Sequence, residues 1–274
     1  MDLHTLLKGA IIGGTMLVPG VSGGSMAMIL GIYDKLISSI SSFHRHKRES
    51  FLFLMFFSLS SGTGMLLFAN PLFLLIEKHP MPLHYFFMGT VFGGIPLIFK
   101  QAEVKRISGK VLLYILVGTL IVILLTFIPA GNFQAKTASV FLSNMLIIAA
   151  GFIAAVALVL PGISVSYMLL ILGLYDETMR AISVLDLSFL IPLFVGLLIG
   201  IILTTKMLEH AMTKHPQPTY LIILGFIIGS IEELFPGMPT TSTWHLCLIM
   251  LLAGFTVIRL ITRWGNKRYA IIES

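Results

Sequence analysis

The chain has 274 residues, of which 57% are hydrophobic and only 11% are charged, with 18 Lys and Arg residues against 12 Asp and Glu. A soluble domain carries about 25% charged residues, so this composition excludes a soluble globular protein and indicates a protein that crosses a membrane several times. The single cysteine, Cys247, excludes an internal disulfide.

Ten apolar segments follow one another along the chain, separated by charged residues or prolines. About 20 helical residues are needed to cross a hydrocarbon core of ~30 Å, and the first two segments fall short of a comfortable crossing. The apolar N-terminus is not interpreted as a cleaved signal peptide, because it has a partner of similar sequence deep in the chain. The segments are 5–18, 23–42, 51–76, 82–99, 111–129, 139–160, 164–182, 188–205, 217–235 and 243–262.

Two Pro-Gly breaks stand in equivalent surroundings. Pro19-Gly20-Val21-Ser22 is followed by Gly31-Ile32-Tyr33-Asp34, and 142 residues later Pro161-Gly162-Ile163-Ser164 is followed by Gly173-Leu174-Tyr175-Asp176. Proline cannot continue a helix, and glycine tolerates the dihedral angles of a sharp turn. We interpret each break as the tip of a re-entrant helical hairpin. The alternative is a pair of ordinary spans joined by a tight turn near one surface.

The similarity extends beyond these breaks. Lys78-His79-Pro80 and Lys214-His215-Pro216 each lead into a further apolar segment. The sequence therefore predicts two copies of one unit, residues 1–130 and 139–265, followed by a tail at 266–274. Each unit would hold one hairpin and three transmembrane helices. Because the number of crossings per unit is odd, the second copy would enter from the opposite face, which makes an inverted repeat of the kind found in secondary transporters.

The basic residues favour one orientation in the membrane. With the N-terminus inside, only Lys78, Lys136 and Arg180 fall in outer connections, and the other 15 of the 18 basic residues fall in inner ones. Positive charge concentrates on the cytoplasmic side of membrane proteins. We expect a multi-pass protein of a bacterial plasma membrane with both termini in the cytoplasm.

The residues that follow each Pro-Gly break have the chemistry of an anion site. A helix N-terminus presents unpaired N–H groups and a partial positive charge, glycine lets a ligand approach the backbone, and serine supplies a hydroxyl. Two tips entering from opposite faces would meet near the middle of the membrane. The alternative is that these small residues serve close helix packing, which we favour for Gly31, Gly173, Gly62, Gly64, Gly89, Gly93 and Gly225. The candidate substrate-binding residues are Ser22, Gly23, Gly24, Ser25, Ser164, Val165, Ser166 and Tyr167, with Pro19, Gly20, Pro161 and Gly162 forming the tips.

A few charged residues are candidates for supporting roles. Arg180 follows the second hairpin and is a candidate phosphate ligand. Asp34 and Asp176 end the returning segments beside tyrosines, where an interfacial anchor with a solvated carboxylate is the plain interpretation and proton coupling the other. Glu232 and Glu233 lie at the end of an apolar segment and are further coupling candidates.

Other kinds of site find no support in the sequence. The eight histidines lack metal-ligand spacing. No P-loop, Ser-His-Asp arrangement or nucleic-acid motif occurs, so we expect no metal, no cofactor, no nucleic-acid partner and no enzymatic activity. A homo-oligomer is compatible with the sequence.

The doubled motif resembles the bacterial polyprenyl-phosphate transporters of the PopT type. The resemblance covers nearly the whole chain and rests on residues 19–25 with 31–34 and on residues 160–164 with 173–176. It implies transport of undecaprenyl phosphate, a lipid carrier for cell-wall sugars, and this agrees with an anion site at the two tips. The chain departs from the family pattern at Ser25, where Thr is common, and at Val165, where Gly is common. The second departure implies that the two tips are not equivalent.

The functional hypothesis is a secondary transporter or flippase that moves this lipid by alternating access. Two alternatives stay open at this point. One is a small-anion channel or exchanger that uses the same tips, and the other is a membrane-embedded lipid-processing enzyme.

Overall fold

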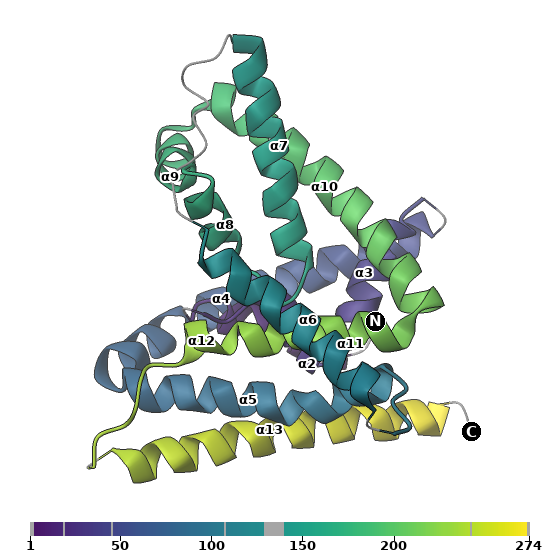
Figure 1. Ribbon diagram of the computed structural model, residues 1–274, viewed down its shortest axis with the longest axis vertical. Helices are drawn as coiled ribbons and strands as arrows, with labels where there is room; N and C mark the ends of the chain where they lie inside the picture. Colours follow the sequence, from purple (N-terminus) through teal and green to yellow (C-terminus); the bar gives the residue numbers. More distant parts are fainter. Residues whose placement is uncertain are drawn as a thin grey trace.

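The computed structural model describes residues 3–18, 20–44, 46–106, 108–128, 140–241 and 243–272, with the backbone alone at residues 140 and 263–272. Throughout these ranges the regular structure is entirely helical (Figure 1). Six of the helices are long and apolar enough to cross a membrane. The prediction of an all-α polytopic membrane protein is therefore confirmed.

The helices of the two halves follow in a similar order of long and short elements. The first half contains α1 (Leu3–Thr15), α2 (Gly23–Ile29), α3 (Tyr33–Ser41), α4 (Lys47–Lys78), α5 (Pro80–Gln101) and α6 (Gly109–Thr126). The second half contains α7 (Val140–Val159), α8 (Val165–Ile171), α9 (Tyr175–Val184), α10 (Leu187–Lys214), α11 (Pro216–Gly229), α12 (Ile231–Leu234) and α13 (Trp244–Ile272). This order is consistent with two copies of one unit, and their opposite orientation in a membrane stays a prediction.

The two halves differ in the length of equivalent helices at two places. The helix before the first Pro-Gly break, α1, has 13 residues and spans roughly 20 Å, whereas its counterpart α7 has 20 and is long enough to cross. Conversely, α11 has only 14 residues, where the sequence predicted a span over 217–235. Ser230 ends α11, and the short helix α12 follows. Re-entrance of the two hairpins stays a prediction.

Each returning segment is two short helices, where the sequence predicted one. The breaks lie at Gly31 and Gly173, both with φ of +67°. In the first copy the amide of Ile32 donates to the carbonyl of Ala27 and the amide of Gly31 donates to that of Met28, and the same pair of bonds recurs in the second copy. This is the Schellman arrangement that ends helices at a left-handed residue. Helix termination therefore explains both glycines. Close packing also applies at Gly31, where an added Cβ would lie 3.2 Å from Leu97 Cδ2, and stays a prediction at Gly173.

Other glycines let helices approach in pairs. A Cβ on Gly64 would overlap the Ala10 carbonyl across the α1–α4 contact, and one on Gly89 would overlap the Leu251 carbonyl across the α5–α13 contact. Gly225 fits against α6 in the same way, and Gly93 lies against α13. The packing interpretation is confirmed at these four positions. It was wrong for Gly62, which has no atom within 4 Å of an added Cβ.

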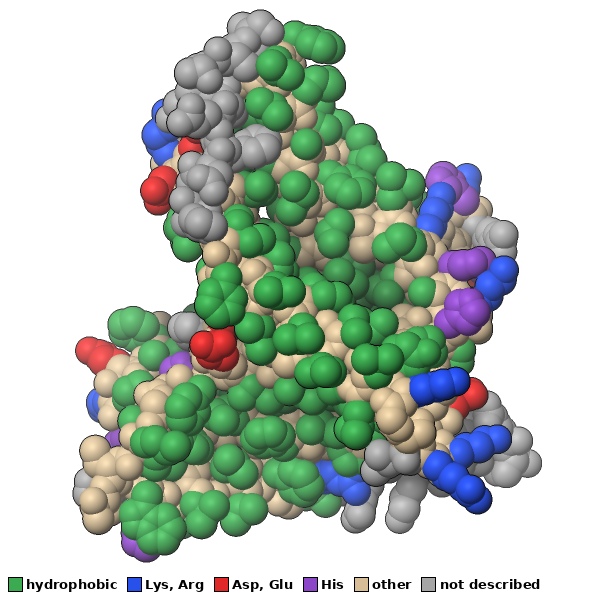
Figure 2. Space-filling view, in the orientation of Figure 1, with side chains coloured by type: hydrophobic (Ala, Val, Ile, Leu, Met, Phe, Trp, Pro, Cys, Tyr) green, Lys and Arg blue, Asp and Glu red, His purple; other side chains and the backbone are tan. Residues whose placement is uncertain are grey.

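The two halves interlock instead of forming separate bodies. Helices α1 and α4 pack within the first half and α7 and α10 within the second, but α5 packs on α13 and α6 packs on α11. Figure 1 shows α7 to α9 rising above the layer that α5, α11 and α13 form, with α10 running down to meet α11. Apolar side chains cover most of the face seen in Figure 2, while Lys, Arg and His side chains gather along the edge where α10 ends.

Candidate functional site

Both Pro-Gly tips lie at one cavity of about 580 Å³. Gly20, Ser22, Gly23 and Gly24 line it from the first tip, and Gly162, Ser164, Val165 and Ser166 line it from the second. The tips also approach each other directly, because a Cβ on Gly24 would lie 3.3 Å from the Cα of Pro161. The predicted meeting of two motifs that are 142 residues apart is thus present in the structure. Pro19 lies outside the described residues.

Glycine is needed at both tips for two reasons. Gly20 has φ of +80° and Gly162 has φ of +84°, a conformation that residues with a Cβ rarely adopt. A Cβ on Gly20 would also lie 2.7 Å from the Glu233 carbonyl oxygen, and one on Gly162 would lie 2.5 Å from that of Phe226. The tips therefore rest directly on the backbone of α11 and α12.

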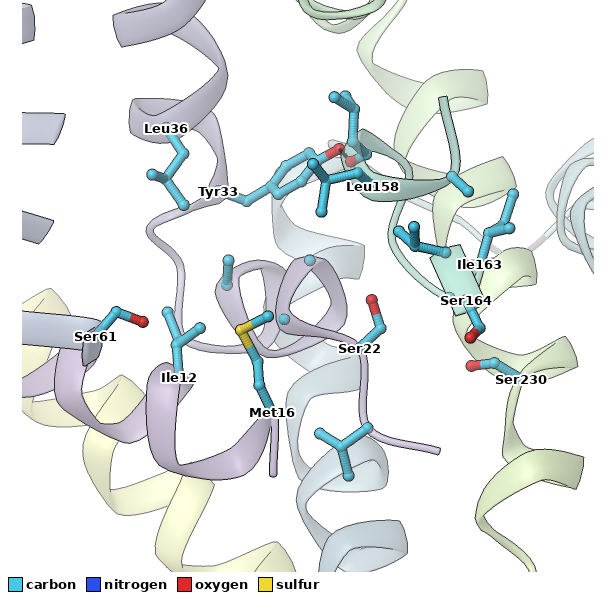
Figure 3. A pocket seen from close by; sticks show the side chains of 18 of the residues that line it. Ile12, Met16, Ser22, Tyr33, Leu36, Ser61, Leu158, Ile163, Ser164 and Ser230 are labelled. Carbon is cyan, nitrogen blue, oxygen red and sulfur yellow. Dashed lines mark hydrogen bonds between the residues drawn. The ribbon is translucent and has the colours of Figure 1, made fainter. Parts of the chain in front are cut away.

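The serines at the two tips differ in their hydrogen bonding. Ser22 is the N-cap of α2 and its side chain makes no capping bond. Ser164 is the N-cap of α8 and accepts a bond of 3.3 Å from the Tyr167 amide. Figure 3 shows Ser22 at the cavity wall and the hydroxyls of Ser164 and Ser230 facing each other. The Ser22 hydroxyl and the unpaired amides of each first helical turn are thus free for a ligand.

The cavity has an apolar wall and little charge. Helices α3 and α4 contribute Leu36, Ile37 and Phe57, and α10 contributes Ile201. Within the described part of the chain, no Lys or Arg lines this cavity, and Glu233 is its one charged lining residue. Backbone amides and hydroxyls are therefore the groups that this site offers to an anion.

A second cavity, of about 460 Å³, adjoins the first. It shares Ser164, Ser166 and Glu233 with the first cavity and adds Tyr167, Tyr175 and Glu232. Two predicted substrate-binding residues, Ser164 and Ser166, thus lie between two cavities, whereas Tyr167 lines only the second.

The remaining candidates lie away from both cavities. Arg180 pairs with Asp186, with Nη2 and Oδ2 3.6 Å apart, and lines neither cavity. Asp34 accepts a hydrogen bond of 3.1 Å from Gln101 at the end of α5. Asp176, in the first turn of α9, is likewise absent from the cavity walls. Among the described residues, no group of three or more His, Cys, Asp or Glu could hold a metal ion.

Tyr33 has a different role from the interfacial anchor that its sequence position suggested. Its side chain is only 3% exposed, and its hydroxyl donates a bond of 2.6 Å to the Val159 carbonyl. Figure 3 shows its ring reaching across the cavity towards Leu158. Further along α3, the hydroxyl of Ser41 donates to the carboxylate of Glu209 on α10. The interfacial interpretation of Tyr33 was wrong, because the tyrosine joins the first half to the second.

Several polar residues of the cavity were missed from the sequence. Ser58 and Ser61 come from α4, Thr205 from α10 and Ser230 from the end of α11. A signal for Ser230 was present, since it follows Gly229 at the place where Gly94 follows Gly93 in the first copy. Ser58, Ser61 and Thr205 lie on long apolar helices, where single hydroxyls carry no positional signal.

Comparison with known proteins places the chain in a family. The model of the undecaprenyl phosphate translocase-like family matches residues 12–247. A polyprenyl-phosphate transporter of Staphylococcus aureus (strain NCTC 8325 / PS 47) is 37% identical over 264 residues, which cover 92% of this chain and 93% of that protein. A polyprenyl-phosphate transporter of Vibrio cholerae serotype O1 (strain ATCC 39315 / El Tor Inaba N16961) is 28% identical over 88% of this chain and 80% of its own length. No solved structure matches significantly. The chain therefore belongs to the undecaprenyl phosphate translocase-like family.

Proposed function

We propose that this protein translocates undecaprenyl phosphate across the bacterial plasma membrane, with the phosphate held between the two Pro-Gly tips. The observation that carries the proposal is the convergence of both tips on one cavity. The names of the two relatives support the class of substrate. The residues proposed to bind phosphate are Ser22, Gly23, Gly24, Ser164, Val165 and Ser166.

The chemistry of the tips suits a phosphate. Its oxygens accept hydrogen bonds, and the tips offer hydroxyls with amides that have no partner inside the first helical turn. Ser22 is the principal side-chain ligand in this proposal, because it does not cap its own helix. Ser164 contributes less, since its oxygen already accepts a bond from the Tyr167 amide.

The apolar cavity wall favours a lipid over a small anion. A polyprenyl chain needs continuous apolar surface next to its headgroup, and Leu36, Ile37 and Phe57 provide such surface beside the tips. A small hydrated anion would gain nothing from these side chains. The small-anion channel or exchanger therefore becomes the weaker alternative.

The two cavities that flank Ser164 support the proposal that the site is reached from both sides of the membrane. In the proposed orientation, the second cavity lies toward the outside, since it includes Thr126 and Glu232 at the predicted outer ends of their segments. The first cavity, which both tips line and which is called the principal cavity below, extends along α3 toward the inside. Toward that end α3 packs on α10, where Ser41 donates to Glu209, and we propose that this contact closes the cavity from the inside. Opening of this contact and closure of the second cavity would expose the phosphate to the cytoplasm.

Of the four candidate coupling carboxylates, Glu233 is the one that lines both cavities. We therefore assign coupling to Glu233 in preference to Asp34, Asp176 and Glu232. A protonatable carboxylate beside the phosphate would repel it when charged and tolerate it when neutral.

Reconstituted liposomes provide the test. A fluorescent polyprenyl phosphate placed in both leaflets is exposed to a membrane-impermeant quencher, and the rate of loss of the protected half is measured. We expect wild-type protein to accelerate this loss and Ser22→Ala to slow it at least tenfold. Ser183→Ala is the matched control, because Ser183 lies on the exposed side of α9 and bonds only the Arg180 carbonyl. Equal rates for wild type and Ser22→Ala would rule out the proposed site.

A further inference from the structure

We propose that a small cavity beneath the first tip binds a monovalent cation, Na⁺, which accompanies the phosphate. This inference rests on the proposed function and adds a second ligand to the same site. The cavity holds about 10 Å³, which is room for one water-sized particle. It is enclosed by the first tip, by α5 and by the ends of α11 and α12, and its polar lining residues are Ser22, Ser25, Thr90 and Ser230.

An unsatisfied hydroxyl shows that this cavity needs an occupant. Ser25 is 6% exposed, and its Oγ has no hydrogen-bond partner. Buried hydroxyls are normally bonded, and an exception calls for an ion or water at the same place. Ser25 was predicted from the sequence as a phosphate ligand, but it lines this small cavity and not the principal one.

The other two buried hydroxyls are arranged as acceptors. Thr90 is 3% exposed and donates its proton to the Phe87 carbonyl at 2.7 Å. Ser230 is 7% exposed and donates to the Ile227 carbonyl at 2.9 Å. With both protons committed to carbonyls, the oxygens keep lone pairs for a further partner. A cation would take these lone pairs, and a water molecule could also fill the cavity by donating its two protons to the same oxygens, so the choice between them rests on the charge around the cavity.

The position of the cavity explains why that partner is a cation. Gly20, Val21, Ser22 and Ser230 line both this cavity and the principal one, so the occupant lies next to the proposed phosphate. None of the described residues that line the principal cavity is Lys or Arg, and Glu233 adds negative charge. A phosphate brought into such a site needs a positive charge beside it. A bound cation supplies that charge without a basic side chain.

The donor set distinguishes among cations. Hydroxyl and carbonyl oxygens suit hard cations, and divalent ions in proteins are usually held by carboxylates. No carboxylate is among the described residues lining the small cavity. Unwound backbone between half-helices is also where transporters coordinate Na⁺. These ligands and this volume therefore point to Na⁺.

The test measures binding of Na⁺ alone to purified full-length protein. The melting temperature in detergent is compared in NaCl and in choline chloride at equal ionic strength. We expect Na⁺ to raise the melting temperature of the wild type in a saturable way. Ser25→Ala and Thr90→Val should weaken the apparent Na⁺ affinity at least tenfold. Thr90→Ser keeps the oxygen and should retain the response, as should Thr256→Val, which removes an exposed hydroxyl of α13.

The outcomes separate this inference from the proposed function. Equal melting temperatures of the wild type in both salts would mean that the cavity holds water, and the inference would be overturned. If lipid translocation by the wild type is as fast in choline as in Na⁺, then the phosphate travels without this cation and the inference fails, while the proposed function stands. A Na⁺ response that disappears in Thr90→Val and persists in Thr90→Ser would support the site even if no lipid is moved.

Discussion

The hydroxyl of Tyr33 donates a hydrogen bond of 2.6 Å to the carbonyl oxygen of Val159, a residue 126 positions later in the chain. Val159 ends α7 immediately before the second Pro-Gly tip, so a side chain of the first copy holds the backbone that leads into the second tip. Tyr175 occupies the position in the second copy that Tyr33 occupies in the first, and it lines the second cavity instead. The Tyr-Asp motif therefore occurs in both copies, but among the described residues only the tyrosine of the first copy bonds the backbone before the opposite tip.

Loss of the Tyr33 hydroxyl should destabilise the protein. Tyr33→Phe leaves the Val159 carbonyl without its partner in a buried place, which costs about 1–3 kcal/mol. We expect a lower melting temperature and a changed translocation rate. Tyr114→Phe is the control, since its hydroxyl makes no hydrogen bond within the described residues. If both variants melt together with the wild type, the bond does not hold the two halves.

Alternating access makes a specific prediction for Tyr175. By the 142-residue correspondence, its partner in the other state is Leu17, just before the first tip. The double variant Leu17→Cys, Tyr175→Cys in a Cys247→Ala background should react with a short bis-maleimide linker and stop translocating. Tyr33→Cys with Val159→Cys is the positive control, because this pair is close in the present structure. If the control pair links and the test pair never does, with or without lipid, then the proposed exchange does not occur.

The second tip should tolerate no side chain at Gly162. Gly162→Ala places a Cβ 2.5 Å from the Phe226 carbonyl oxygen at φ of +84°. The left-handed conformation alone costs about 1–2 kcal/mol, and the overlap adds to this. We expect a markedly lower melting temperature and loss of translocation. Gly62→Ala should leave both unchanged or raise stability slightly, because the site is open and alanine favours helix over glycine. Similar behaviour of the two variants would contradict this account of the tip.

Substitution of the two N-cap serines should have different effects, one on stability and the other on translocation. Ser164→Ala removes a cap and should cost about 0.5–2 kcal/mol of stability, because its oxygen accepts the Tyr167 amide. Ser22→Ala removes no such bond and should melt with the wild type while translocating at least tenfold more slowly. Thermal unfolding and the liposome assay on the same preparations test this. The reverse pattern would assign the phosphate chiefly to the second tip.

The amino-acid sequence was enough to predict the class of protein and the positions of the residues at the two tips. The length of an apolar segment and its lack of charge distinguish a membrane helix from a soluble one. The backbone angles that Pro161 and Gly162 adopt end a helix locally, within a few residues. The doubled motif also pointed to two tips that belong to one site. These are local or compositional properties, so they can be predicted without knowing which helices touch.

The partners of these residues could not be predicted, because they come from distant parts of the chain. The burial of Tyr33 against Val159, the small cavity around Ser25 and the place of Ser230 in the site all depend on contacts between distant segments. Helix α5 packs both on α2 of its own half and on α11 of the other half, and these contacts bring Thr90 beneath the first tip beside Ser230. Such contacts are set by the packing of whole helix faces, so no spacing within one segment predicts them.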